Sequence, residues 1–200
     1  MEKRIYISAD YSNNNGDRNV VDILKRWGQD NLHKVNFIDM AQVISGSVSE
    51  NPDCRPCDLK SEFNRQINAS SAVIFVVGDY TAKRIAGNAC SLAKYISPSF
   101  CTPYKGNANG KQYCKYTRTV PAINNVGNVN TYSYIHHEFE QAKKKEKIII
   151  IFYNSLRKEV GWLPDYMKQY EQSAQPFWIK NSLGEKVGNY SYLKKVLNYE

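Results

Sequence analysis

The chain has 200 residues, a mass of 23.0 kDa, and 27 Lys and Arg against 19 Asp and Glu, which gives a formal net charge of +8. This length is that of one ordinary domain. Hydrophobic residues at 42% and aromatic residues at 12% exclude a disordered chain, and no stretch approaches the roughly 20 apolar residues of a membrane helix. Asp10 interrupts the apolar run Ile5–Ala9 too early for a secretory signal, so we expect a cytoplasmic protein.

The positive charge is concentrated in one part of the sequence. Residues 1–79 hold nine basic and eleven acidic side chains, residues 80–137 hold seven basic and no acidic ones, and residues 138–200 hold eleven basic and eight acidic ones. Clustered Lys and Arg bind polyanions by displacing phosphate counterions. The charge therefore raises the question of a nucleic acid or another anionic partner.

Strand and helix patterns alternate along the chain. The β-rich run Ile5–Ala9 predicts a first strand, and the helical spacing of Val20, Leu24 and Trp27 predicts a helix that ends at Gly28. The remaining predicted elements, in chain order, are a strand at 35–40, a helix at about 57–68, a strand at 72–78, a helix at 134–145, a strand at 147–153, a last strand at 176–180 and a closing helix at 190–199. This alternation predicts an α/β domain with a parallel sheet and helices on both sides.

One segment, at about 87–133, does not fit the alternation. It is rich in Gly, Pro, Asn and Tyr and has no sustained periodicity. So long a loop is uncommon inside a compact domain, so we interpret it as a surface insertion in a single domain of residues 1–200. We expect the insertion to contribute to function, and a passive loop is the alternative.

The predicted sheet also indicates where a ligand would bind. In open α/β sheets ligands bind at the carboxyl ends of the strands, here the polar turns after Ala9, Met40 and Gly78. These turns hold neither the glycine-rich phosphate loop of dinucleotide dehydrogenases nor that of nucleoside triphosphatases. The G-x-S-x-G motif of serine hydrolases is also absent from the sequence.

Several blocks, in this order, resemble the successive blocks of a TIR-like domain. They are 5–11 followed by Arg18 and Trp27, then 35–39, then 67–84, and then His137-Glu138-Phe139 with its helix and the strand 148–152. Asn154-Ser155-Leu156 is similar in particular to TIR-like proteins of the bacterial Thoeris antiphage systems. The resemblance implies a TIR-like, flavodoxin-like three-layer domain with a central parallel five-stranded sheet. The insertion before the glutamate helix departs from the family pattern.

The resemblance also implies an enzyme that cleaves NAD between nicotinamide and ribose, with NAD as substrate and no further cofactor. Nicotinamide leaves as a neutral base, so the chemistry needs a carboxylate beside a sugar that becomes an oxocarbenium ion. Residues Ile135, Phe139 and Ala142 form the expected buried stripe of the helix, with Glu138 on its flank and Glu140 toward solvent. We therefore predict that Glu138 is catalytic. The alternative is a structural carboxylate near the helix N-terminus.

By the same resemblance, further residues are predicted to bind the substrate. They are Ser8, Ala9, Asp10, Tyr11, Arg18, Asp39, Lys83 and Arg84. Ser8 would hydrogen-bond the ligand and Tyr11 would stack on it, whereas Asp10 has a loop cap as its alternative role. The structural alternative for Arg18 is an ion pair with Asp17 or Asp22. Lys83 and Arg84, with some of the insertion's cations, are expected to border the site and favour an anionic dinucleotide; those cations are Lys105, Lys111, Lys115 and Arg118.

No metal site is predicted. His136 and His137 are adjacent, so they point to different helix faces, and we expect both at the site edge or in solvent. Cys54 and Cys57 form half of a zinc-like pattern, but the spacing to the other three cysteines is long and irregular. In a cytosolic protein, free thiols are the expected state.

Two classes of function remain. The first is an NAD nucleosidase or ADP-ribosyl cyclase-like enzyme, whose product, linear ADP-ribose or a cyclic isomer, activates a separate effector in antiphage defence. A phage-derived trigger and a homo-oligomer would then be partners, and a membrane would not. The second is a non-enzymatic TIR-like adaptor or nucleic-acid-binding module that uses the basic insertion. A nucleoside deoxyribosyltransferase-like enzyme, with related chemistry at a glycosidic bond, is a third interpretation.

Overall fold

The computed structural model describes residues 3–10, 17–29, 35–39, 55–84, 104–106, 112–114 and 133–198. The strands are β1 (Lys3–Ser8), β2 (Val35–Asp39), β3 (Ala72–Val77), β4 (Tyr104–Gly106), β5 (Gln112–Cys114), β6 (Ile148–Tyr153), β7 (Gln175–Pro176), β8 (Trp178–Lys180) and β9 (Lys186–Gly188). The helices are α1 (Arg18–Gly28), α3 (Arg55–Asn68), α4 (Tyr134–Lys144) and α5 (Tyr190–Leu197), with short 3-10 helices η1 (Thr81–Lys83) and η3 (Asp165–Tyr170).

Five strands form the central sheet, in the order β2-β1-β3-β6-β7, and every neighbouring pair is parallel. The register places Ile5 beside Ala72, and Ala72 beside Ile148. This is the strand order of flavodoxin-like doubly wound domains, in which the first strand lies inside the sheet. The predicted fold class, an α/β domain with a central parallel five-stranded sheet, is therefore confirmed.

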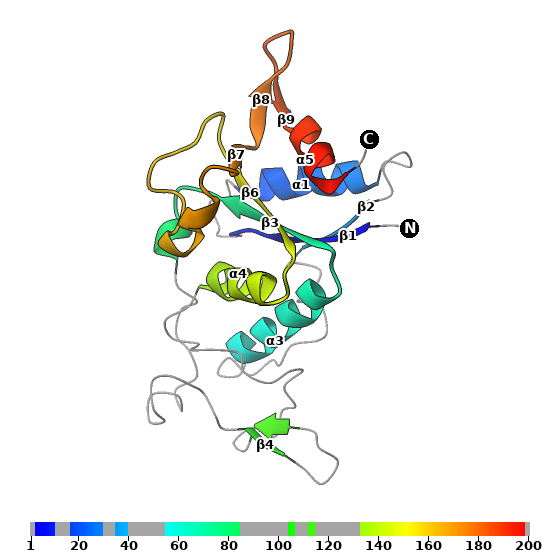
Figure 1. Ribbon diagram of the computed structural model, residues 1–200, viewed down its shortest axis with the longest axis vertical. Helices are drawn as coiled ribbons and strands as arrows, with labels where there is room; N and C mark the ends of the chain where they lie inside the picture. Colours follow the sequence, from blue (N-terminus) through cyan, green and yellow to red (C-terminus); the bar gives the residue numbers. More distant parts are fainter. Residues whose placement is uncertain are drawn as a thin grey trace.

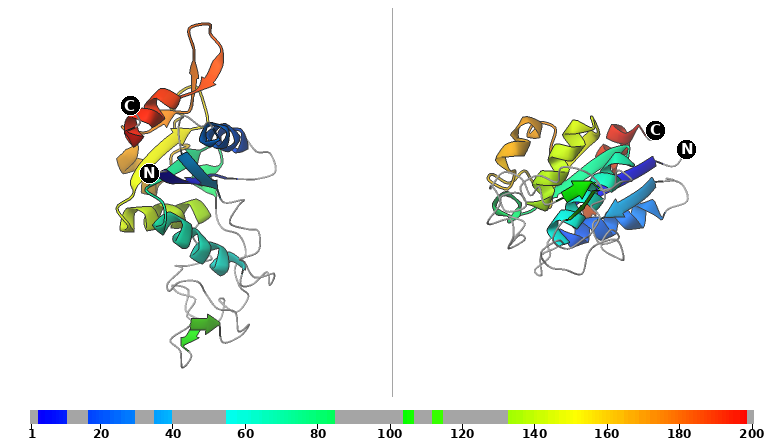
Figure 2. Two further views of the ribbon diagram at one scale, coloured as in Figure 1. Left: turned by 90° about the vertical axis from the view of Figure 1, so that its right-hand side faces the viewer. Right: turned by 90° about the horizontal axis from the view of Figure 1, so that it is seen from below.

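Helices cover both faces of the sheet, with α1 and α5 on one side and α3 and α4 on the other (Figures 1 and 2). Each face has its own hydrophobic cluster, because alternate residues of a strand point to opposite faces. Ile5 and Ile7 pack toward α1 and α5, whereas Tyr6 packs toward α3 and α4. All six residues of β3 are buried, as expected for a strand covered on both faces.

The helix α4 begins at a well-defined cap. Ser133 has extended backbone angles, and its hydroxyl accepts a hydrogen bond from the His136 backbone N–H at 3.0 Å. Residues Ile135, Phe139 and Ala142 are buried, so the predicted stripe of this helix is confirmed. The cap fixes where the helix starts at the carboxyl edge of the sheet, and thereby places Glu138 one turn inside it.

The predicted last strand, 176–180, is wrong as a single element. Pro176 belongs to the edge strand β7, which pairs with β6, whereas Trp178 starts β8, which pairs antiparallel with β9 outside the central sheet. Proline has no N–H for a ladder, so it suits an edge strand, and Phe177 between the two strands is fully buried. The hairpin of β8 and β9 projects from the domain (Figure 1). Its turn contains Gly184 at a φ of +79°.

The described part of the insertion is a two-stranded antiparallel sheet of β4 and β5. The rest of 87–132, with Lys111, Lys115, Arg118, Cys90 and Cys101, lies outside the described residues. The prediction of one domain over residues 1–200 therefore stays a prediction. Among the helices that the structure describes, none is long and apolar enough to cross a membrane.

Candidate functional site

The carboxylate of Glu138 lies between α4 and the end of β1. The Tyr6 hydroxyl donates to Glu138 Oε1 at 2.6 Å, and the Ser8 hydroxyl donates to Oε2. Tyr6 and Ser8 are two residues apart on a strand, so both side chains point to the same face of the sheet. Ser8 ends β1, which places the three groups at the carboxyl edge where ligands of such sheets bind.

Burial of Glu138 is complete, with no exposed surface at all. The sequence predicted that Glu138 lies on the flank of the buried stripe of α4. In the structure its side chain is inside the protein, because two hydroxyls on β1 donate hydrogen bonds to the carboxylate there. Burial raises the pKa of Glu138 to about 7, against the opposing effect of the two hydrogen bonds from Ser8 and Tyr6. A carboxyl that titrates near neutral pH is suited to proton transfer and to charge stabilisation.

Tyr6 is a member of this site that the sequence analysis missed. It was interpreted only as part of the apolar first strand, yet it is fully buried and carries a hydroxyl that needs a partner. The available signal was its spacing of two residues from Ser8, which already stood among the candidates. That spacing places Tyr6 on the same face of the strand as Ser8.

The second glutamate of α4 is exposed, as the helix geometry predicted. The side chain of Glu140 is 47% exposed and pairs with Lys143 at 3.7 Å. His136 Nε2 lies 4.0 Å from the same carboxylate. Glu140 therefore belongs to the solvent-facing side of the helix and provides a matched control for Glu138.

The expectation for the two histidines is wrong for His137. Its side chain is buried and its Nε2 lies 2.9 Å from the Asn64 side-chain oxygen on α3. Burial, with the nearby charge of Lys60, lowers the pKa of His137 to about 3, so the ring is neutral. The prediction failed because α3 packs against this side of α4. His136 is half-buried and stacks on Tyr166 with ring centroids 3.8 Å apart.

Asp10 and Arg84 come together beyond the ends of β1 and β3. Arg84 Nε donates to Asp10 Oδ2 at 2.6 Å, and a second guanidinium nitrogen donates to Oδ1 at 3.0 Å. This two-point pairing is the strong form of an arginine–carboxylate contact. Ala9 is buried, and Lys83 is exposed in η1. The roles predicted for these residues in substrate binding stay predictions.

Arg18 and Asp39 lie apart from Glu138. Arg18 is exposed in the first turn of α1 and forms no ion pair with Asp17 or Asp22. Asp39 ends β2, is buried, and pairs with Lys25 of α1 at 2.6 Å. The structure therefore does not bring either residue into contact with the Glu138 carboxylate. Tyr11 lies outside the described residues.

A second polar cluster, also missed from the sequence, lies on the α1 side of the sheet edge. Asn154 donates to Asp17 Oδ1 at 3.1 Å and accepts from the Trp178 indole N–H at 2.7 Å. Burial raises the pKa of Asp17 to about 6, with a smaller contribution of the same sign from the charge of Asp10. Asn154 was noted only as part of a family-like tripeptide. Its contacts depend on the hairpin that carries Trp178, which sequence spacing does not reveal.

The described residues contain no group of three or more His, Cys, Asp or Glu side chains arranged to hold a metal ion. Cys54, Cys90 and Cys101 lie outside the described part of the chain. The prediction of free thiols is thus not tested.

Comparisons with known proteins yield a structural similarity and no sequence match. No family model and no curated protein matches the chain. A solved structure described as the crystal structure of a prokaryotic SEFIR domain is similar over 98% of this chain and 94% of that one, with 14% identity and a TM-score of 0.45. We assign no residue role from this similarity.

Proposed function

We propose that the chain is a TIR-like enzyme that cleaves NAD between nicotinamide and ribose. The observation that carries the proposal is the Glu138 carboxylate, held by Tyr6 and Ser8 at the carboxyl edge of the sheet. The order of the TIR-like sequence blocks supports it as well, because the glutamate of the last block is this residue. The assignment to NAD rests on that resemblance.

Cleavage of the bond between nicotinamide and ribose requires one negative charge, held in a fixed position beside the ribose. As the bond between ribose C1′ and the pyridinium nitrogen breaks, its electron pair leaves with nicotinamide, and the ribose carbon becomes positive. The ionised form of Glu138 stabilises this charge, and the low dielectric of its surroundings strengthens the effect. Water that attacks C1′ gives ADP-ribose and a proton. Attack by another group of the same molecule gives a cyclic isomer.

The burial of Glu138 sets a requirement on this reaction. Both carboxylate oxygens already accept hydrogen bonds, and the side chain has no exposed surface. Ribose hydroxyls must therefore replace at least one of the two protein donors. Because ribose hydroxyls are donors of the same kind as those of Ser8 and Tyr6, this exchange conserves the number of hydrogen bonds.

We expect Arg84 to bind the pyrophosphate in the proposed complex. Its guanidinium is bound by Asp10 at the carboxyl ends of β1 and β3, near the end of the strand that carries Ser8. An incoming pyrophosphate would compete with Asp10 for this group, because both present paired oxygens to an arginine. Lys83, in the preceding 3-10 helix, adds a second positive charge to the segment.

The proposed biological setting is antiphage defence. Similarity of the 154–156 tripeptide to TIR-like Thoeris proteins supports a cytoplasmic role in antiphage defence. The product, a cyclic isomer of ADP-ribose by this reading, would activate a separate effector. A phage-derived trigger and assembly into homo-oligomers belong to the same proposal.

A second candidate function is a non-enzymatic TIR-like adaptor. The observation that favours it is the complete burial of Glu138, because a buried carboxylate between two hydroxyls also ties α4 to β1. In an adaptor these hydrogen bonds would stabilise the packing of α4 against β1, and no substrate would bind. This alternative predicts that the wild type cleaves no NAD. It also predicts that removal of the Glu138 carboxylate lowers the free energy of unfolding.

The two functions are separated by incubating purified protein with NAD and measuring nicotinamide by chromatography and the ribose product by mass spectrometry. The proposal expects nicotinamide together with linear or cyclic ADP-ribose in equal molar amount. An intact NAD pool in this incubation, and also in one that adds an extract of phage-infected cells to supply the proposed trigger, would support the adaptor.

A further inference from the structure

The Asp17 carboxylate lies at the carboxyl ends of three neighbouring strands of the central sheet, β1, β3 and β6. At the end of β3, a Cβ on Gly78 would lie 2.6 Å from Asp17 Oδ1. At the end of β6, the Asn154 side chain donates to the same oxygen at 3.1 Å. At the end of β1, the Asp10 backbone N–H hydrogen-bonds the carboxylate as well. Asp17 is only 6% exposed, so the three strand ends meet around a buried acid.

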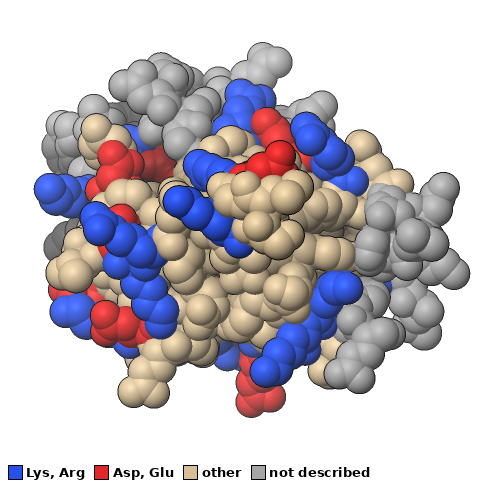
Figure 3. All heavy atoms as spheres, turned by 90° about the horizontal axis from the view of Figure 1, so that it is seen from above, with Lys and Arg blue, Asp and Glu red and all other residues tan. Residues whose placement is uncertain are grey.

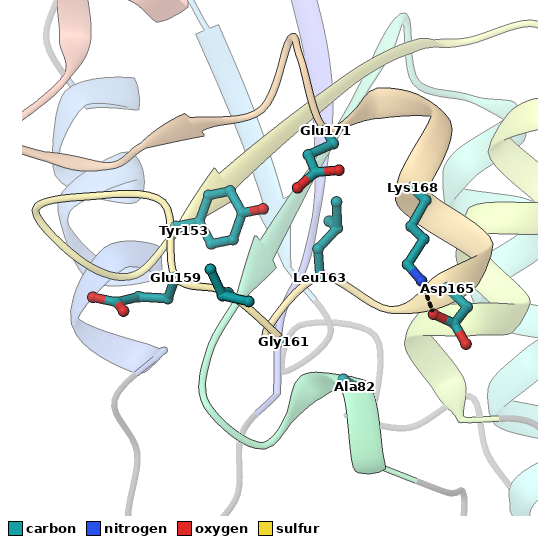
Figure 4. A pocket seen from close by; sticks show the side chains of 9 residues that line it. Ala82, Tyr153, Glu159, Gly161, Leu163, Asp165, Lys168 and Glu171 are labelled. Carbon is teal, nitrogen blue, oxygen red and sulfur yellow. Dashed lines mark ion pairs between the residues drawn. The ribbon is translucent and has the colours of Figure 1, made fainter.

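The backbone at the end of β6 places Asn154 on this face of the sheet. Consecutive residues of a strand point to opposite faces, so Asn154 is on the α1 side, whereas Tyr153 is on the other side and lines a surface pocket (Figure 4). The Asn154 backbone N–H donates to the Val77 carbonyl at 2.9 Å, which continues the pairing of β6 with β3. The Asn154 side chain therefore extends from a backbone that the sheet holds in place.

A second hydrogen bond leads from Asn154 to the β8–β9 hairpin. The indole N–H of Trp178, a buried residue at the start of β8, donates to Asn154 Oδ1 at 2.7 Å. The two bonds run in one direction, from the indole through the amide to the Asp17 carboxylate. In such a chain each bond polarises the next, so the charge on Asp17 also strengthens the contact between Asn154 and Trp178.

The charge on Asp17 depends on pH. Burial raises its pKa to about 6, against the hydrogen bond from Asn154, and the charge of Asp10 acts in the same direction as burial. The charged groups that act on Asp17 from the ends of β1 and β3 are Asp10, which is paired with Arg84, and Asp79. The side chains that face it from β6 and from the hairpin are neutral. A fall in pH through about 6 therefore adds a proton to Asp17 and removes its charge.

We propose that Asp17 is a pH-dependent switch that controls how tightly the β8–β9 hairpin is bound to the ends of the central strands. The ionised carboxylate binds the Asn154 amide and, through it, the Trp178 indole. The protonated carboxyl offers only neutral hydrogen bonds, which are weaker, so both contacts loosen. The proton comes from solvent, and no covalent bond to carbon forms or breaks. The switch is independent of NAD cleavage, because Glu138 and Tyr6 lie on the other face of the sheet.

The test follows the Trp178 indole N–H by NMR on the isotope-labelled full chain, with its resonance assigned from the Trp178→Phe variant. In the wild type, the chemical shift of this proton is expected to change with pH with a midpoint near 6. Asp17→Asn keeps the shape of the side chain and cannot ionise, so it is expected to abolish the change. Asn154→Ala is expected to abolish it too, because this variant removes the link while the Asp17 carboxyl remains.

Exchange of the same indole proton with solvent measures the strength of the contact at one pH. At a pH well above 6, where the wild-type Asp17 is ionised, Asp17→Asn and Asn154→Ala are expected to exchange this proton faster than the wild type, by about threefold to tenfold. Asp22→Asn is the matched control, because it makes the same charge change at an exposed position of α1. It should match the wild type in both measurements.

Loss of the midpoint and faster exchange in both variants, with an unchanged control, support the proposal. A wild-type shift without a midpoint near 6, the same midpoint in Asp17→Asn, or equal exchange rates in the wild type and Asn154→Ala would each overturn it. The wild-type titration needs no variant, so the proposal stays testable even where a variant does not fold.

Discussion

Glu138 is a buried acid whose protonation differs between the folded and the unfolded chain. Its pKa is about 7 in the folded protein against an ordinary value of 4.5, because burial disfavours the charged form. Between these two values the folded chain keeps a proton that the unfolded chain has released. The stability contributed by the protonated carboxyl is therefore complete below about pH 4.5 and is lost as the pH rises through about 7.

This linkage gives a stability prediction. Between pH 4.5 and 8, the free energy of unfolding of the wild type should fall relative to that of Glu138→Gln, by at most roughly 3 kcal/mol. Urea denaturation of both proteins at several pH values measures the difference. Asp17 also has a raised pKa, of about 6, so its ionisation lowers the free energy of unfolding as the pH rises. Because this effect is the same in the wild type and in Glu138→Gln, the difference between the two proteins reports on Glu138 alone. Parallel pH profiles for the two proteins would show that Glu138 ionises normally.

In the proposed reaction, Tyr6 acts through Glu138, as a positioning residue beside Ser8. Their hydrogen bonds favour the charged carboxylate, so Tyr6→Phe should raise the pKa of Glu138 further and reduce its ionised fraction at pH 7. We expect kcat for nicotinamide release to fall about tenfold and the rising limb of its pH profile to move to higher pH.

Tyr192→Phe is the control for this variant, because it also removes a hydroxyl that donates a hydrogen bond, here to the Ser173 carbonyl on a different part of the surface. Its pH profile should match that of the wild type. If Tyr6→Phe lowers kcat without moving the profile, the role assigned to the Tyr6 hydroxyl is wrong.

At the scale of elements, α1 approaches β3 closely at one glycine. A Cβ at Gly78 would lie 2.6 Å from Asp17 Oδ1, and the Asp17 carboxylate is held there by Asn154. Gly78→Ala should therefore destabilise the protein by about 1–3 kcal/mol in urea denaturation. In an Asp17→Ala background the same substitution should cost clearly less, because the clashing oxygen is gone. Equal costs in both backgrounds would contradict this reading of the contact.

The elements also show how far the sequence could predict the structure. The strands at β3 and β6 and the stripe of α4 follow from runs and periodicities of residues that are near in sequence. The break at Phe177 and the burial of His137 depend on partners distant in sequence, Tyr153 and Asn64 respectively. Glu138 and Ser8 became candidates through the resemblance to TIR-like domains, with helix geometry separating Glu138 from Glu140. Tyr6, Asp17 and the contact of Asp10 with Arg84 depend on partners distant in sequence and were not predicted.

At the scale of the whole molecule, the net charge of +8 belongs mainly to one segment of the sequence. On the face seen in Figure 3, positive and negative side chains are interspersed and do not form one basic band. This arrangement gives no support to nucleic-acid binding through the face shown, since polyanion binding needs clustered cations.

The charge leads to a prediction for the insertion. Replacing Lys105, Lys111, Lys115 and Arg118 together by Gln should raise KM for NAD severalfold and leave kcat unchanged, because a charge that attracts the dinucleotide contributes to binding alone. Duplex DNA should bind the wild type no tighter than about 1 µM at physiological salt, the non-specific range. Tight, salt-sensitive DNA binding that the same substitutions abolish would instead assign the insertion to nucleic acid.

The central claim, that Glu138 stabilises a developing charge on ribose, is tested most directly by nicotinamide release from NAD by the wild type, Glu138→Gln and Glu140→Gln in one assay. Both variants remove one carboxylate charge from the same helix, one in the interior and one in solvent. The account predicts a loss of at least about 100-fold for Glu138→Gln and less than twofold for Glu140→Gln. Equal release by all three proteins would contradict it.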